Sequence, residues 1–257
     1  MSRWIDLTGK LEDGMWNYGA PFPEVVIEKV ADAALFGYEG HAFQLHSLAG
    51  TYLETANHLF PDRERLGDVS IDRLKTRAWV AQLPNKRPFE SIGAAELEEA
   101  VGSVLEPGDA LLIATGWDAY WNREGFTESS PYFEPEAMEW IIARDVGLLG
   151  MDITSIEDPR KPGGEMTLLA RYYAKDRLMV APLVNLREAG RGPWTLLALR
   201  CTFPMRAPPL RAVLFEPDCK GQGWVCSQAC WRQPALWRGA ARRIRRRRGW
   251  GARCSVR

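Results

Sequence analysis

The chain of 257 residues has no long run of apolar residues. No uninterrupted apolar stretch approaches the ~18 residues that would suggest a membrane-spanning helix. The first residues, MSRWIDLTGKLEDG, hold no apolar run of signal-peptide length. We therefore expect a cytoplasmic protein that does not bind a membrane. A hydrophobic fraction of 46% and a charged fraction of 26% are typical of a globular protein.

Cysteine is almost absent from most of the chain. Residues 1–216 hold a single cysteine, Cys201, and the other four lie in residues 217–257. One cysteine cannot make a disulfide framework, which agrees with a reducing compartment.

The net charge of zero averages two unlike regions. Residues 217–257 hold eleven Lys/Arg and one Asp/Glu, which leaves 22 basic and 32 acidic residues in 1–216. We therefore expect two parts: a domain over 1–216 and a basic tail over 217–257 that is rich in Arg, Trp and Cys.

The tail allows three interpretations. It could be a basic arm for nucleic acid, or a partial zinc site of Cys219, Cys226 and Cys230, although Cys-x6-Cys-x3-Cys is not a usual spacing. Its composition cannot build a core, and the third interpretation is a disordered or aberrant extension, such as a segment read in a wrong frame. We favour the third, so nucleic acid is not an expected partner.

Strand-like runs and helical patterns alternate along residues 1–216. The strand-like runs cover 3–8, 24–30, 42–50, 78–83, 110–116, 147–153, 177–183, 194–203 and 211–216. Helical patterns cover 93–109, 134–147 and 166–175. The alternation predicts an α/β or α+β domain with a mixed sheet.

The stretch HSLAGTYLETANHLF, residues 46–60, holds two of the three histidines. If residues 43–54 are extended, alternate side chains share one face. Those side chains are His46, Leu48, Gly50, Tyr52 and Glu54. A turn over 55–58 would return His58 toward the same face. A carboxylate, a phenol and imidazoles gathered in this way suit proton transfer.

Each of these residues also has a purely structural interpretation. His46 could be a hydrogen-bonded strand histidine, and Tyr52 could pack with its hydroxyl satisfied. Glu54 and His58 could form an ordinary structural pair. His41, which follows GYEG, is expected in a surface loop.

The stretch LAGTYLETANH, residues 48–58, resembles the signature His-x-Gly-Thr-His-x-Asp-x-Pro-x-His. That signature belongs to the cyclase family that includes bacterial kynurenine formamidase and isatin hydrolase. Further segments resemble the family in order along residues 3–216. They are WIDLTGKLEDGMW, LEPGDALLIATGWDAYW, VGLLGMDITSIEDP, LVNLREAG and PLRAVLFE.

The resemblance implies a fold, an assembly and an activity. The implied fold is a mixed β-sheet or barrel-like core with flanking helices. The implied assembly is a homo-oligomer, either a dimer or a tetramer. The implied activity is metal-assisted hydrolysis of an amide C–N bond in an arylformamide or a cyclic amide, in tryptophan catabolism for kynurenine formamidase.

This sequence departs from the family at its metal ligands. The two ligand histidines fall on Leu48 and Tyr52, and the aspartate becomes Glu54. His58 keeps the position that the family uses for acid–base chemistry.

Two later ligand positions are also changed. A histidine ahead of a Leu-Leu helix has Glu165 as its nearest equivalent, and a glutamate falls on Ala181. Catalytic zinc usually needs three protein ligands, with His prominent. We expect no tightly bound zinc. A weakly held Zn, Mn or Mg would have to use Glu54, His58 and Glu165, with His46 as a substitute.

The resemblance favours a small-molecule hydrolase that needs a metal weakly or not at all. His58 would be the general base or acid, Glu54 would orient it, and Tyr52 would donate a hydrogen bond to an oxyanion. Aromatic residues in loop-like segments could form a pocket for a planar substrate. They are Trp16, Tyr18, Trp117, Trp121, Tyr132 and Phe133.

Three alternatives stay open from the sequence. One is cyclisation or lyase chemistry, and another is a metallohydrolase with altered ligands. The third is a pseudoenzyme, a binding module that retains the fold without the chemistry.

Overall fold

The computed structural model describes residues 3–161, 167–200 and 208–216. The chain divides after Pro217, and every described residue lies before that point. The tail of 217–257, Glu165 and Cys201 lie outside the described residues. No helix among the described residues is long and apolar enough to cross a membrane.

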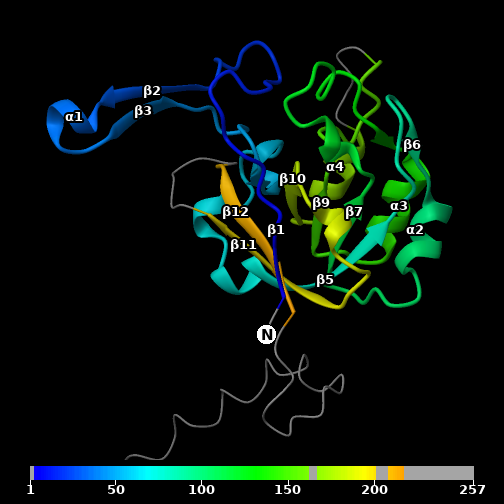
Figure 1. The fold of residues 1–257 in the computed structure, drawn as a ribbon. Helices are drawn as coiled ribbons and strands as arrows, with labels where there is room; N and C mark the ends of the chain where they lie inside the picture. The colour runs from blue at the N-terminus through cyan, green and yellow to red at the C-terminus, as the bar shows by residue number, and fades with distance from the viewer. Residues whose placement is uncertain (1–2, 162–166, 201–207, 217–257) are drawn as a thin grey trace, which may run out of the picture. The chain divides into compact units, whose positions relative to one another are not determined.

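An eight-stranded mixed sheet forms the centre of the fold (Figure 1). Its strand order is β1-β12-β11-β5-β7-β9-β10-β4. The strands are β1 Trp4–Asp6, β4 Tyr52–Glu54, β5 Lys75–Gln82, β7 Ala110–Ala114, β9 Leu148–Met151, β10 Leu178–Ala181, β11 Trp194–Arg200 and β12 Leu210–Phe215. The four strands β5, β7, β9 and β10 are parallel, and the others pair antiparallel. The α+β architecture with a curled mixed sheet is as the sequence predicts.

Helices cover one face of the parallel strands. They are α2 Ala94–Val101, α3 Pro135–Ala143 and α4 Thr167–Tyr173. The apolar side chains of β7 alternate between two core clusters: Leu111 and Ile113 pack with the helices, and Leu112 packs on the opposite face. Burial on both faces explains why β7 is a continuous apolar run.

Short elements complete the connections. They are the parallel pair β6 Ser91–Ile92 and β8 Tyr132–Phe133, and the single 3-10 turns η1 Ala56–His58, η2 Leu66–Asp68, η3 Ile71–Leu74, η4 Trp117–Tyr120 and η5 Leu186–Glu188.

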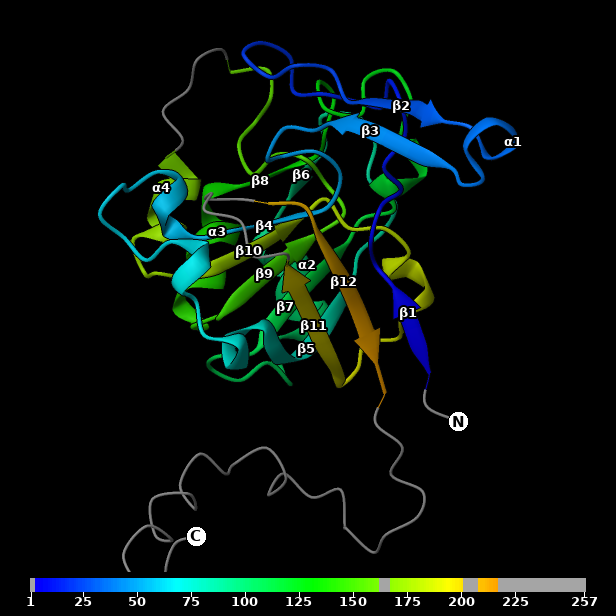
Figure 2. The same cartoon turned by 90° about the vertical axis from the view of Figure 1, so that its left-hand side faces the viewer.

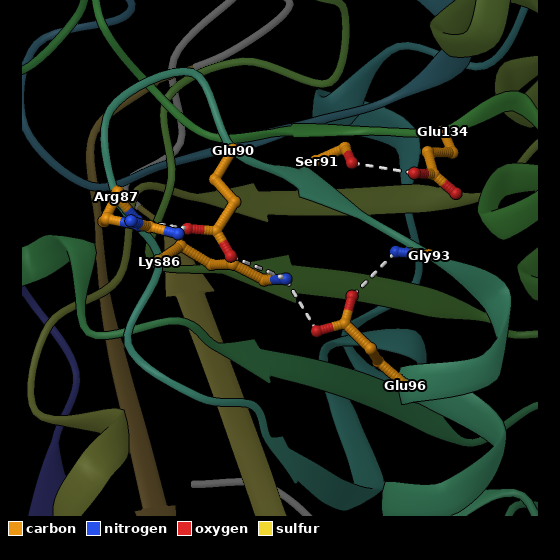
Figure 3. Close-up of polar contacts among 7 residues, drawn as sticks. All are labelled: Lys86, Arg87, Glu90, Ser91, Gly93, Glu96 and Glu134. Carbon is orange, nitrogen blue, oxygen red and sulfur yellow. Dashed lines mark hydrogen bonds and ion pairs between the residues drawn. The ribbon is translucent and has the colours of Figure 1, made fainter.

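A polar cluster fixes the loop after β5 to the start of α2 (Figure 3). The ammonium group of Lys86 donates to Oε1 of Glu96 at 2.6 Å, and its side chain is 5% exposed. The other oxygen of Glu96 accepts from the backbone N–H of Gly93, the residue before α2. One carboxylate therefore caps the helix and neutralises a buried ammonium group.

An arm made of β2 Val26–Ala31, α1 Ala33–Phe36 and β3 Gly40–Gln44 extends from the sheet (Figures 1 and 2). Its large apolar side chains are exposed to solvent. They are Val26, Val30, Leu35, Phe36, Tyr38 and Phe43. His41 lies on β3 with an exposed side chain, so its expected place in a loop is wrong.

The continuous extended segment expected over 43–54 is wrong. Strand β3 ends at Gln44, residues 47–51 turn, and the chain becomes extended again at Tyr52. Gly50 has φ +65°, and an added Cβ would lie 2.6 Å from a methyl carbon of Leu11. Because of this turn, strand alternation does not determine where His46 lies.

Candidate active site

Strand β4 presents Tyr52 and Glu54 on the helix-covered face of the sheet. The pairing register sets Tyr52 opposite Ala181 and Glu54 opposite Met179 of β10. Alternation sends Leu53 into the core cluster on the other face. The residues Tyr52 and Glu54 are 4% and 2% exposed.

The turn after β4 returns His58 to Glu54. Thr55 begins the 3-10 turn η1, and its hydroxyl accepts a hydrogen bond from the backbone N–H of Asn57. The Nδ1 atom of His58 lies 3.5 Å from Oε1 of Glu54, and the His58 side chain is 25% exposed. The turn predicted from the sequence therefore forms and brings the two residues together.

Tyr173 of α4 is the second partner of Glu54. Its hydroxyl donates to Oε2 of Glu54 at 2.7 Å. The sequence prediction did not include Tyr173. The available signal was its position in the apolar stripe of LLARYY, since a buried tyrosine usually finds a hydrogen-bond partner.

Tyr18 and Tyr52 form a pair of phenols. Their hydroxyl oxygens are 2.8 Å apart, and the Tyr18 hydroxyl also donates to the carbonyl of Thr154 at 3.3 Å. The two rings meet edge to face, with centroids 6.4 Å apart. Tyr18 was predicted as a substrate-binding residue, whereas its contact with Tyr52 was not predicted.

Burial controls the ionisation of these groups. Burial raises the pKa of the Glu54 carboxyl, while the electrostatic interaction with His58 and the hydrogen bond from Tyr173 lower it. Burial also raises the pKa of both Tyr52 and Tyr18 well above the ordinary phenol value. Both phenols are therefore neutral hydrogen-bond donors near pH 7.

These residues line a cavity of about 350 Å³. Its walls are Tyr18, Phe22, Leu48, Tyr52, Glu54, His58, Thr127, Met151, Thr154, Ser155, Ile156, Glu157, Pro159, Leu169, Met179 and Ala181. Most of these side chains are apolar, two are carboxylates, and none of these residues is Lys or Arg. The cavity suits a small, largely apolar ligand.

The other predicted aromatic residues do not line this cavity. Trp117 and Phe133 are 1% exposed and belong to the core. Trp16 packs edge-on against Tyr18 and Trp121, and lines a separate, open pocket with Asn122 to Ser129. The remaining member, Tyr132, accepts a hydrogen bond from Arg160.

His46 also lies outside the lining of the cavity. Its ring packs against Phe22 at 4.9 Å, and it is 7% exposed. Neither ring nitrogen has a hydrogen-bond partner among the described residues. Burial lowers the pKa of this imidazole, so it is neutral near pH 7.

Asp152, just after β9, is a buried carboxyl that the sequence prediction did not single out. It accepts hydrogen bonds from the backbone N–H groups of Thr115 and Gly116 and from the Thr115 hydroxyl, all within 2.8 Å. Burial raises the pKa of Asp152 to about 7. Its contacts hold the loop that leads into η4 beside the segment that lines the cavity.

Among the residues that the structure describes, the side chains at this site do not fit a catalytic metal ion. Leu48 and Ala181 have no donor atom, and burial opposes the anionic form of Tyr52. Among the described residues, no group of three His, Cys, Asp or Glu could hold an ion. Glu54 and His58 are two donors where catalytic zinc has three, and Glu165 lies outside the described residues.

The sequence matches one family model and one characterised protein. A family model described as "Putative cyclase" matches residues 5–158. A kynurenine formamidase from Geobacillus thermodenitrificans (strain NG80-2) is 26% identical over 159 residues, which are 61% of this chain and 71% of that protein.

Three solved structures share the fold. An isatin hydrolase bound to the product analogue thioisatinate superposes with a TM-score of 0.72 at 19% identity, covering 84% of this chain and 93% of that one. Isatin hydrolase A from Ralstonia solanacearum superposes with a TM-score of 0.71 at 18% identity, covering 83% of this chain and 92% of that one. A potential metal-dependent hydrolase with cyclase activity superposes with a TM-score of 0.68 at 14% identity, covering 84% of this chain and 100% of that one.

Proposed function

The chain belongs to the cyclase family, and on that premise we propose that it hydrolyses the amide C–N bond of an aromatic or cyclic small molecule. The observation that carries the proposal is the Glu54–His58 pair in the wall of a cavity of about 350 Å³. Relatives that include a kynurenine formamidase and isatin hydrolases support this class of reaction.

His58 is the general base in this proposal. Its Nδ1 atom faces Glu54, so Nε2 is the nitrogen left to take a proton from the attacking water. The water oxygen bonds to the carbonyl carbon while ionised Glu54 stabilises the imidazolium ion that forms. Tyr52 donates a hydrogen bond to the carbonyl oxygen as it becomes negative.

The same histidine completes the reaction as an acid. It returns its proton to the nitrogen as the C–N bond breaks, which leaves a carboxylic acid and an amine. For a cyclic amide both products stay in one opened molecule. No step passes through a metal, because Glu54 and His58 are too few donors for a catalytic zinc ion.

The charge of the side chains that line the cavity limits the class of substrate that can bind. Glu54 and Glu157 both border the cavity, and no Lys or Arg is among the described residues that line it. An anionic substrate would meet uncompensated negative charge in a largely apolar space. The proposed substrate is therefore an uncharged, planar amide.

The test is hydrolysis of formanilide and of isatin by the full chain, with and without EDTA. We expect turnover that survives EDTA and falls by about 10²–10⁴ in His58→Ala, the range for a general base. His41→Ala is the matched control, because His41 is exposed on the arm and is not among the residues that line the cavity. An anionic analogue, 4-formamidobenzoate, should react more slowly than formanilide.

Two results would contradict the proposal. Activity that disappears with EDTA and returns with zinc would show a metallohydrolase with altered ligands. Absence of turnover on both substrates would favour a binding module that retains only the fold.

A further inference from the structure

The hydrogen bond between the hydroxyl groups of Tyr18 and Tyr52 can run in either direction, because each group carries a proton. If Tyr18 donates to the Thr154 carbonyl, at 3.3 Å, then Tyr52 donates to Tyr18. If Tyr18 donates to Tyr52 instead, at 2.8 Å, the proton of Tyr52 is free to point elsewhere. Tyr18 is the one hydrogen-bond partner of the Tyr52 hydroxyl among the described residues.

A carbonyl oxygen in the cavity would select the second direction. Tyr18 and Tyr52 both line the cavity, so a ligand oxygen beside Tyr52 could accept its free proton. Tyr18 would then donate to Tyr52, and Tyr52 would donate to the ligand. Hydrogen bonds in such a chain polarise one another, so Tyr52 becomes a stronger donor than an isolated phenol.

We infer that Tyr18 and Tyr52 act as one oxyanion-binding element, in which Tyr52 contacts the substrate oxygen and Tyr18 positions and polarises Tyr52. The inference rests on the proposed hydrolysis. It assigns to two phenols the stabilisation of negative charge that a metal ion gives in a metallohydrolase.

The surroundings of the two phenols suit this role. Both stay neutral near pH 7, because burial holds the pKa of each above the ordinary value. A neutral donor in an apolar wall stabilises an oxyanion more than the same group in water does. The ring of Tyr18 makes an edge contact with Trp16, with centroids 5.4 Å apart, and this contact helps to position the hydroxyl oxygen of Tyr18 before the substrate arrives.

The position of Tyr52 supports the same conclusion. It stands where the family resemblance puts a ligand histidine, and it shares the cavity with Leu48 and Ala181, which offer no donor atom. Glu54 accepts a hydrogen bond from Tyr173 and is ionised in the proposed mechanism, so it has no proton to donate to an oxyanion.

The experiment is a double-mutant cycle on the full chain with Tyr18→Phe, Tyr52→Phe and the double variant. Each change removes one hydroxyl and keeps the ring. For Tyr52→Phe we expect kcat to fall about 10²–10³-fold with little change in KM, the effect of losing one oxyanion donor. For Tyr18→Phe we expect a smaller fall, of about three- to tenfold, the effect of one weakened hydrogen bond.

Non-additivity distinguishes positioning from a general structural effect. Because Tyr18 acts through Tyr52, the double variant should be no slower than Tyr52→Phe alone. Tyr172→Phe is the matched control, since Tyr172 is a buried tyrosine whose hydroxyl donates at 2.8 Å to Leu178 and does not line the cavity. It should keep wild-type kcat, and melting temperatures should confirm that every variant is folded.

The outcomes separate the inference from the proposed function. If His58→Ala abolishes turnover while Tyr52→Phe keeps wild-type kcat, the oxyanion assignment is wrong and the hydrolase proposal stands. If the two losses in kcat add up in the double variant, Tyr18 does not act through Tyr52. If the wild-type protein turns over neither formanilide nor isatin, the proposed function fails and the inference fails with it.

Discussion

Glu54 is a buried carboxylate whose two oxygens have different partners. Oε1 faces Nδ1 of His58 at 3.5 Å, and Oε2 accepts the hydroxyl proton of Tyr173 at 2.7 Å. A carboxylate in an apolar wall would lose its charge without such partners. In the proposed mechanism, Tyr173 would favour the ionised form of Glu54 and hold its carboxylate beside His58.

The change Tyr173→Phe should alter the pH dependence of the reaction. The hydrogen bond from Tyr173 lowers the pKa of Glu54 against the opposing effect of burial. Its loss raises that pKa further, so the protonated, inactive form persists to higher pH. The acidic limb of the kcat/KM profile should move upward in pH, with activity on that limb reduced by roughly three- to tenfold, the effect of one lost hydrogen bond.

Steady-state rates across the pH range check this expectation. Tyr172→Phe, on the neighbouring position of α4, should leave the profile unchanged. A uniform loss of activity at every pH would indicate that Tyr173 serves packing alone.

At the residue scale, the sequence could locate part of the site. Tyr52, Glu54 and His58 lie within seven residues of each other, so alternation and one turn were enough to bring them together. Tyr18 and Tyr173 are 34 and 119 residues away from their partners. No local sequence pattern predicts contacts of that separation, because they depend on how α4 and the segment between β1 and β2 pack against β4.

At the scale of elements, the main strands and helices follow from the apolar patterns. Each of the nine strand-like runs overlaps a strand, although β4 lies outside all of them, and the three helical patterns contain α2, α3 and α4. The boundaries are less accurate: α2 ends at Val101, before Gly102, although the apolar pattern continues to Leu105. The turn at Gly50 was missed because its cause is a left-handed φ and a contact with Leu11, far away in sequence.

The link between the loop after β5 and α2 should depend on Lys86. The change Lys86→Met removes a buried ammonium group and leaves Glu96 without its cation. We expect a loss of about 1–3 kcal/mol in the free energy of unfolding, less than for a fully buried pair because Glu96 is 32% exposed. Urea unfolding measures this difference.

An exposed ion pair supplies the control for this change. Lys10 pairs with Glu12, and both side chains are exposed, so Lys10→Met should change stability by well under about 1 kcal/mol. Equal effects of the two changes would show that the burial of Lys86 contributes nothing of its own.

At the scale of the whole molecule, the arm leaves apolar surface uncovered. An isolated two-stranded hairpin is marginally stable in water. The six exposed apolar residues of the arm are 40–81% exposed. We propose that a second copy of the chain covers this surface.

Changing the tip of the arm should therefore weaken self-association. We expect Leu35→Ser with Phe36→Ser to shift the protein from dimer or tetramer toward monomer at micromolar concentration, as measured by sedimentation velocity. Ile71→Ser is the control, because Ile71 is 69% exposed and lies outside the arm. A wild-type protein that is monomeric throughout would contradict the expectation.

The pairing of β1 with β12 has a consequence for synthesis on the ribosome. Trp4 pairs with Phe215, and the backbone N–H of Glu216 donates to the carbonyl of Arg3, so the first strand closes the sheet against the last. Strand β1 emerges early but has no partner until about residue 216 has left the exit tunnel. During that interval β1 has an unpaired strand edge, the kind of edge that can pair with another chain.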